Sequence, residues 1–231
     1  INPSNKAGTH LQFLAGGGFQ YRTVKTTSNC TYGSGPPTTV PTGRIVDYQG
    51  NWTSAAIPSN GIIFIEDDAW VDGTLPAGTR VTLVAAKEPL ASGAAVIWIN
   101  NDLAYAVKDG SIALGLIAQQ DIRIGLYSED DLAVDAGMIA QKGRIRREYY
   151  PSSCSAANYK RNSITTFGSL ATNQRYGFSW VCNPGSVYCS GYNLRTLNFD
   201  SKLTYGPPPS FPVSGEYQFI SWEELNPGQA F

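Results

Sequence analysis

Short aliphatic strands that end in the same kind of polar turn recur through the middle of this 231-residue chain. In each copy an aliphatic residue closes one strand, a few polar or small residues make the turn, and another apolar run follows. The clearest copies span residues 65–71, 99–105, 117–124 and 139–145. With two weaker copies, the leading positions are Ile65, Val84, Ile99, Ile117, Ile139 and Leu170, separated by 19, 15, 18, 22 and 31 residues. This spacing predicts a β-solenoid, because a coil of three short strands needs about 18 residues.

Stacked coils would explain why the apolar positions repeat. Each coil can bury its aliphatic side chains only when neighbouring coils cover them, and one interior Ile or Leu contributes about 1.5–3 kcal/mol. No window of a dozen residues has the apolar spacing and the caps of a helix. We therefore expect an all-β chain. An antiparallel β-sandwich is the main alternative, although it gives no reason for one turn pattern to recur.

Composition excludes several functional classes. The chain has 17 Lys and Arg against 18 Asp and Glu, and charged residues make up 15% against a usual ~25%. Nucleic acid is therefore not an expected partner, since phosphate binding needs a clustered positive excess. His10 is the only histidine, which excludes multi-histidine metal sites and leaves any serine or cysteine triad dependent on this residue. No apolar run approaches the ~20 residues of a membrane-spanning helix.

The four cysteines, Cys30, Cys154, Cys182 and Cys189, lack C-x-x-C spacing and predict two disulfides rather than a redox motif or a zinc ribbon. Three pairings are possible. The turn sequence at 183–186 would bring Cys182 and Cys189 together, which favours that pair and leaves Cys30 with Cys154. Four buried free thiols are the alternative. Because disulfides persist outside the reducing cytosol, we expect an extracellular or cell-surface location.

We divide what we expect to be a single domain into three parts. Residues 1–60 form an N-terminal flank with a Pro/Thr/Gly-rich loop, residues 61–180 the solenoid body, and residues 181–231 a disulfide loop, a Pro-rich segment and a terminal strand. The triple proline at 207–209 predicts polyproline II, either as an SH3 or WW ligand or, more simply, as a spacer anchored on the body by Tyr205 and Phe211. Residues 216–222 alternate like a strand that would cap an open end of the stack.

Several segments resemble a known kind of bacterial protein. The matching motifs lie at 60–73, 114–119, 136–143 and 147–150, and the ending at 203–224 is the most specific part. Over roughly residues 55–225, the chain resembles the C-terminal region of PilX-type, minor-pilin-like pilus-assembly proteins, which occur notably in candidate-phylum bacteria. The resemblance implies a right-handed parallel β-helix, and a parent protein anchored in the membrane by an N-terminal prepilin-type helix that this sequence does not contain. It supplies no catalytic residues.

Acidic residues gather at the turns of successive repeats, namely Asp67, Asp68, Asp102 and Asp121. Aligned on one stripe, they would suit a polysaccharide lyase or glycoside hydrolase with Arg123 as an electrostatic helper, or a Ca²⁺ site. Acidic residues in turns also cap corners and hydrate the surface. We favour this simpler interpretation and expect neither a catalytic site nor a cofactor.

The candidate binding residues are basic and aromatic. Arg144, Arg146 and Arg147 belong to the main basic concentration, and Trp70, Trp98 and Tyr105 combine flat apolar faces with polar groups that suit sugar or protein contact. We expect a non-catalytic extracellular surface or pilus-associated protein that acts in adhesion or pilus assembly. Its partners would be pilin or surface-protein subunits, a glycan or a host surface. The alternatives are the polysaccharide-cleaving enzyme and a self-assembling filament subunit.

Overall fold

A computed structural model describes residues 1–182 and 188–212, and it confirms that this chain is all-β. None of the helical structure among the described residues is long and apolar enough to cross a membrane. The strands are β1 (Gly8–Phe13), β2 (Phe19–Tyr32), β3 (Thr38–Ala55), β4 (Ile62–Ile65), β5 (Ala69–Leu75), β6 (Arg80–Ala85), β7 (Ile97–Ile99), β8 (Leu103–Tyr105), β9 (Ala113–Ala118), β10 (Ile122–Ile124), β11 (Asp131–Ala140), β12 (Ile145–Arg147), β13 (Lys160–Thr172), β14 (Ser179–Trp180) and β15 (Ser190–Phe199), followed by the 3₁₀ turn η1 (Ser201–Thr204).

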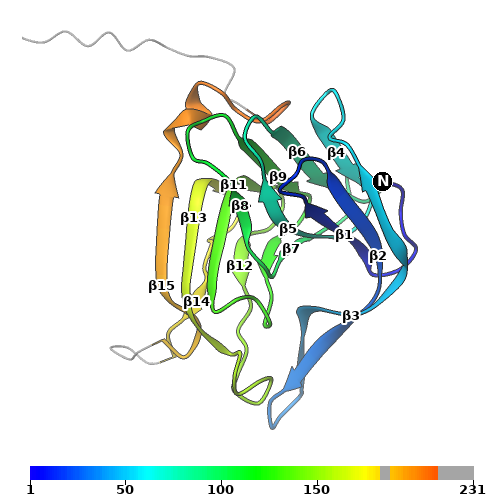
Figure 1. Ribbon diagram of the computed structural model, residues 1–231. Coiled ribbons are helices and arrows are strands. Elements are labelled where there is room, and N and C mark those ends of the chain that lie inside the picture. The colour runs from blue at the N-terminus through cyan, green and yellow to red at the C-terminus, as the bar shows by residue number, and fades with distance from the viewer. Residues whose placement is uncertain (183–187, 213–231) are drawn as a thin grey trace, which may run out of the picture.

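The strands belong to one 15-stranded sheet that curls around a central core (Figure 1). One parallel ladder runs through β4, β6, β9, β11, β13 and β15, and a second through β1, β5, β7, β10 and β12. Strand β8 pairs with both β5 and β11 and so links the two ladders.

The predicted right-handed parallel β-helix is wrong. The sheet is a mixed, mostly parallel half-barrel, in which β2 is antiparallel to both β1 and β3, and β14 is antiparallel to β15. A solenoid coil of about 18 residues would break into short strands at its corners. Instead, β11, β13 and β15 run for 10, 13 and 10 residues. The turn pattern predicts where some strands end. It does not specify how long each strand is or which strands complete the sheet.

The residues that lead the sequence repeats do not form one buried column. Val84, Ile117 and Ile139 pair across β6, β9 and β11, but Val84 and Ile139 are only half-buried. Ile65 and Leu170 each lie one register position away from this row. Because neighbouring residues of a strand point to opposite faces, a shift of one position exchanges the inner and outer faces.

The buried column therefore lies one residue earlier in these strands. Its members, paired from strand to strand, are Ile63, Leu83, Leu116 and Met138. Each is at most 3% exposed and belongs to the main core cluster. Stacking in register lets each side chain cover the next, which is the stabilising contact that the repeat pattern suggested.

The long β2–β3 hairpin covers the outer face of β5 and β7 and builds a second, smaller core of Val24, Trp70, Val96 and Trp98. Gly43 of β3 makes this approach possible. Its φ of +72° suits glycine, and a Cβ there would collide with the Trp98 ring. The Gly43 carbonyl accepts hydrogen bonds from Trp70 Nε1 and Asn100 Nδ2, each at 2.7 Å.

Two disulfides brace the sheet, and both pairs are those favoured by the sequence. Cys30, near the end of β2, is bonded to Cys154 in the loop after β12, and Cys182 is bonded to Cys189. The turn expected at 183–186 lies outside the described residues. The Cys30 bond links the hairpin to the loop at 148–159, where the Tyr150 hydroxyl also donates to the Pro41 carbonyl at 2.8 Å.

The Pro-rich segment lies across the outer face of β6, β9 and β11. Arg80 Nη2 donates to the Pro207 carbonyl at 2.8 Å, and the Phe211 ring occupies the space above Gly115 and Gly137. Of the two expected anchors, Phe211 makes this contact, whereas Tyr205 is 90% exposed. The expected capping strand at 216–222 lies outside the described residues.

Candidate functional site: an arginine pocket beside β12

The outer face of the ladder β5–β7–β10–β12 changes from aromatic to cationic. Its register pairs Trp70 with Trp98, Trp98 with Arg123, and Arg123 with Arg146. The two indole rings stack with centroids 6.2 Å apart, and the Arg123 guanidinium carbon lies 5.5 Å from the centroid of the Trp98 ring. Parallel strands in register place these side chains in one continuous row.

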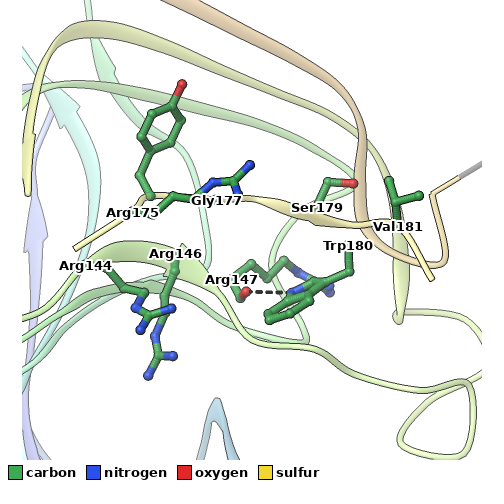
Figure 2. Close-up of a pocket in the computed structure, with 9 residues that line it drawn as sticks. Arg144, Arg146, Arg147, Arg175, Gly177, Ser179, Trp180 and Val181 are labelled. Carbon is green, nitrogen blue, oxygen red and sulfur yellow. Dashed lines mark hydrogen bonds between the residues drawn. The ribbon is translucent and has the colours of Figure 1, made fainter. Parts of the chain in front are cut away.

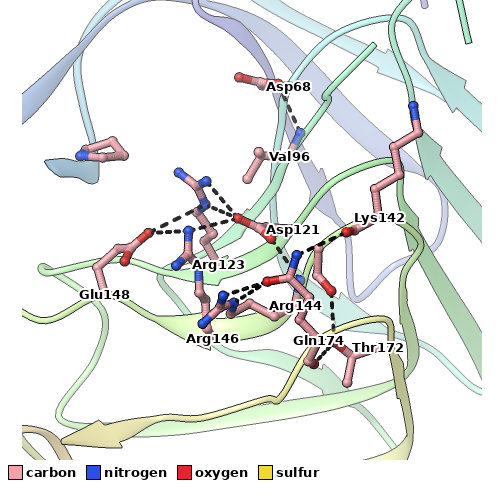
Figure 3. A network of polar contacts seen from close by, with 12 residues as sticks. Asp68, Val96, Asp121, Arg123, Lys142, Arg144, Arg146, Glu148, Thr172 and Gln174 are labelled. Carbon is pink, nitrogen blue, oxygen red and sulfur yellow. Dashed lines mark hydrogen bonds and ion pairs between the residues drawn. The ribbon is translucent and has the colours of Figure 1, made fainter. Parts of the chain in front are cut away.

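Two carboxylates neutralise the arginines in this row (Figure 3). Asp121 Oδ2 lies 2.7 Å from Arg123 Nη2 and 3.1 Å from Arg146 Nη2, and Glu148 Oε1 lies 2.7 Å from Arg146 Nη2. Burial raises the pKa of Asp121. The backbone N–H of Arg144 and the two guanidinium groups outweigh burial, so the pKa of Asp121 lies below its ordinary value. Asp121 is therefore a charged structural centre for this face.

Beyond β12 the arginines open onto a cavity of about 440 Å³ (Figure 2). Its principal lining side chains are Arg144, Arg146, Arg147, Arg175, Tyr176 and Trp180. One wall is β12, and the other is the segment 175–181. A parallel bridge between Arg146 and Gly177 joins the two walls. The cavity volume falls within the ~300–1,000 Å³ common for small-molecule sites.

Arg147 supports the cavity from within the protein. Its guanidinium donates to the carbonyls of Leu126, Asn158 and Tyr159 at 3.2, 2.8 and 3.2 Å. Burial lowers the pKa of Arg147 to about 10, so the side chain stays charged at neutral pH. Arg147 therefore holds the loop at 148–159, and its guanidinium is not available to a ligand.

Arg144, Arg147 and Arg175 have no acidic partner among the described residues, and of these Arg147 is enclosed by backbone carbonyls. Arg144 donates through Nε and Nη2 to the neutral Gln174 Oε1, at 3.2 and 2.6 Å. Arg175 is exposed and has no hydrogen bond or ion pair within the described ranges 1–182 and 188–212. Arg144 and Arg175 are therefore the two cavity cations that neither a carboxylate nor backbone carbonyls hold within the described ranges.

Two aromatic side chains stand beside these charges. Tyr176 is 46% exposed and Trp180 is 41% exposed. The indole N–H of Trp180 donates to the Arg147 carbonyl at 3.1 Å, as drawn in Figure 2, and its ring meets Tyr149 edge to face. The orientation of the indole is therefore set before any ligand arrives, while much of its surface remains in solvent.

The structure separates the six predicted binding residues into two groups. Arg144, Arg146 and Arg147 do come together at the cavity. Trp70 and Trp98 are only 4% and 5% exposed beneath the hairpin. Tyr105 lies in the core, where its hydroxyl accepts a hydrogen bond from the Leu114 N–H at 2.8 Å. The sequence did not single out Arg175 and Trp180, which also line the cavity. The available signal was their position a few residues before Cys182, which was expected to form a disulfide.

The four acidic residues considered as a possible stripe are distributed among separate structural contacts. Asp68 pairs with Lys87 at 2.7 Å, Asp102 accepts from the Ala133 N–H at 2.8 Å, and Asp121 holds the arginines. Asp67 accepts hydrogen bonds from the backbone N–H and the hydroxyl of Ser4. Within the described part of the chain, no three His, Cys, Asp or Glu side chains are arranged to hold a metal ion.

His10 lies beside a smaller cavity of about 190 Å³ near the hairpin. Its Nδ1 lies 2.8 Å from the Tyr48 hydroxyl and its Nε2 lies 2.9 Å from Asp72 Oδ2. Both ring nitrogens are therefore engaged, and neither contacts a serine or cysteine side chain. The contacts pin β3 to β1 and β5.

Comparison with known proteins gives little further guidance. No family model and no curated protein matches the chain. Among solved structures, the competence-associated pilin ComZ from Thermus thermophilus is similar, at 14% identity and a TM-score of 0.36. The match covers 90% of this chain and 41% of ComZ, so the chain spans less than half of that protein's length. A likeness this distant carries no argument about function.

Proposed function

We propose that this protein is a non-catalytic, extracytoplasmic surface protein of the pilus-associated kind, which binds an anionic partner through the arginine pocket. The observation that carries the proposal is the pair of cations, Arg144 and Arg175, that neither a carboxylate nor backbone carbonyls hold within the described ranges, on a cavity whose walls are already fixed. The resemblance of residues 55–225 to minor-pilin-like proteins motivates the pilus association.

The location follows from cysteine chemistry. All four cysteines are in disulfides. Because such bonds are rare in reducing compartments, the two bridges are consistent with an extracytoplasmic location. The Cys30–Cys154 bond also ties the hairpin to the loop after β12, and this restraint would lower the conformational entropy lost when a partner binds.

The residues at the cavity favour binding over bond cleavage. Glycoside hydrolysis generally uses two carboxyl groups on either side of the scissile bond. No carboxylate or histidine is among the residues that line the cavity within the described ranges. The nearby Asp121 and Glu148 are occupied by Arg123 and Arg146, which supports a structural role for both.

Binding to immobilised acidic ligands, both glycans and acidic peptides, tests this proposal. The Arg144→Ala/Arg175→Ala double variant should lose at least tenfold in affinity for its best acidic ligand. Lys25→Gln is the matched control, because it removes an exposed cation that pairs with Asp47 on the hairpin. Failure of the wild-type protein to bind any acidic ligand, or equal binding by the double variant, would refute the proposal.

A self-assembling subunit is a second candidate, supported by the far edge of the sheet. Along β15, Leu194, Leu197 and Phe199 are 56%, 41% and 65% exposed. Among the described residues, β14 pairs with this edge only at Ser190 and Gly191. Analytical ultracentrifugation tests this candidate: self-association that Phe199→Ser abolishes would support it, and a concentration-independent monomer would exclude it.

A further inference from the structure

We infer that the arginine pocket recognises a sugar that carries a single carboxylate, with the carboxylate at Arg175 and the sugar ring against Trp180. This inference rests on the proposed function and specifies its ligand. Three features of the site support it: the number of free charges, the exposed aromatic surface and the engaged backbone between the two walls.

The number of free charges limits the ligand's charge. Arg123 and Arg146 are neutralised by Asp121 and Glu148, and Arg147 is enclosed by backbone carbonyls. Two cations, Arg144 and Arg175, remain. Within the described part of the chain, no residue accepts a hydrogen bond from the Arg175 guanidinium. A guanidinium binds a carboxylate through two parallel hydrogen bonds. A polyphosphate or a heavily sulfated chain would need a larger positive excess than this pocket supplies.

The aromatic side chains of the pocket would contact the sugar ring. A pyranose ring presents C–H groups on one face, and indole and phenol rings provide flat apolar surfaces with a polar group at the edge. Trp180 and Tyr176 are both more than two-fifths exposed and both line the cavity. Since the indole N–H is already bonded to the Arg147 carbonyl, the ring is held in position to stack.

The backbone groups that join the two walls of the pocket are engaged, which argues against a peptide. Peptides often bind by adding a strand to a free sheet edge. Here the Gly177 N–H donates to the Ile145 carbonyl at 3.1 Å, and the Gly177 carbonyl accepts from the Arg147 N–H at 2.9 Å. The Trp180 carbonyl accepts from the Cys189 N–H at 2.7 Å. These groups are therefore not open to an added strand, which favours recognition of the ligand by side chains.

The test uses glycans that differ only in the carboxylate. Glucuronate-, galacturonate- and sialate-terminated glycans are presented beside their methyl esters, and affinities for the best pair are measured by calorimetry. We expect the free acid to bind at least tenfold more tightly than its ester. Arg175→Gln should reduce this difference to less than twofold, because the acid loses a charged partner and the ester loses only a neutral hydrogen bond. Trp180→Ala should weaken both ligands, with partial recovery in Trp180→Phe, and Trp52→Ala is the aromatic control outside the pocket.

The outcomes distinguish this inference from the function on which it rests. If acidic peptides or sulfated glycans bind more tightly than every carboxylated sugar, and Arg144→Ala/Arg175→Ala abolishes that binding, the sugar inference is wrong and the proposed function stands. If acid and ester bind equally, the inference is likewise wrong. If no acidic ligand of any class binds, both are wrong. Circular dichroism and thermal unfolding of each variant show whether a loss reflects misfolding.

Discussion

At the scale of single residues, Asp121 organises the outer face of the sheet. Its side chain is 4% exposed, yet it meets two guanidinium groups and the Arg144 N–H. A buried carboxylate is costly unless such donors satisfy it, and removing it would leave its partners only partly neutralised. The same contacts set the position of Arg144 at the cavity. The stability of this face and the ligand recognition that we propose therefore depend on one carboxylate.

We predict that Asp121→Asn lowers the free energy of unfolding by about 3 kcal/mol, because Arg123 and Arg146 lose their shared partner in a half-buried setting. Urea unfolding at neutral pH measures this change. Asp47→Asn, which breaks the exposed pair with Lys25, is the control and should have a far smaller effect. Equal effects of the two substitutions would contradict a central role for Asp121.

The same residue predicts a dependence of stability on pH. Because the pKa of Asp121 is lowered in the folded protein, its contribution is present above the ordinary value of 3.8 and is lost as the pH falls through the folded value. The difference in stability between the wild-type protein and Asp121→Asn should thus shrink between neutral pH and about pH 2.5. Unfolding curves across this range test it. A difference that stays constant would show that the charge of Asp121 is not what stabilises this face.

At the scale of elements, the β2–β3 hairpin and the loop after β12 act together. The hairpin buries Trp70 and Trp98, and the loop is held by Arg147 through the Asn158 and Tyr159 carbonyls. The Cys30–Cys154 bond joins them across 124 residues of sequence. A disulfide that closes a long loop restricts the unfolded chain more than one that closes a short loop.

We predict that Cys30→Ser/Cys154→Ser destabilises the protein by up to about 5 kcal/mol, and Cys182→Ser/Cys189→Ser by up to about 2.5 kcal/mol, on the chain-entropy estimate. Thermal and denaturant unfolding of both variants gives the comparison. Amide hydrogen exchange should show faster opening of β2 and β3 in the first variant only. The opposite order of stability would indicate that native contacts, rather than loop closure, dominate the effect of these bonds.

At the scale of the whole molecule, one sheet curls so that its inner face forms the core and its outer face carries the hairpin, the Pro-rich segment and the arginine pocket. The core depends on columns that run from strand to strand. Leu116 is fully buried between Leu83 and Met138, whereas Ile139 in the next strand is half-buried.

We predict that Leu116→Ala costs about 3–4 kcal/mol, the cost of a cavity in a packed core, and that Ile139→Ala costs about 1 kcal/mol. Chemical denaturation with an unchanged m-value measures both. If Ile139→Ala proves the more damaging, the inner and outer faces of these strands are assigned the wrong way round.

From the sequence alone, the all-β character and the favoured cysteine pairing could be predicted, because local apolar runs and a turn between two cysteines act over short distances. The sequence also singled out Arg144, Arg146 and Arg147, which line one cavity in the structure. Tertiary structure decided what distant strands determine: the open, mixed sheet, the burial of Trp70, Trp98 and Tyr105, and the meeting of the arginines with Arg175 and Trp180. The physical reason is register. A shift of one residue turns every side chain of a strand to the other face, and only the pairing of whole strands sets that choice.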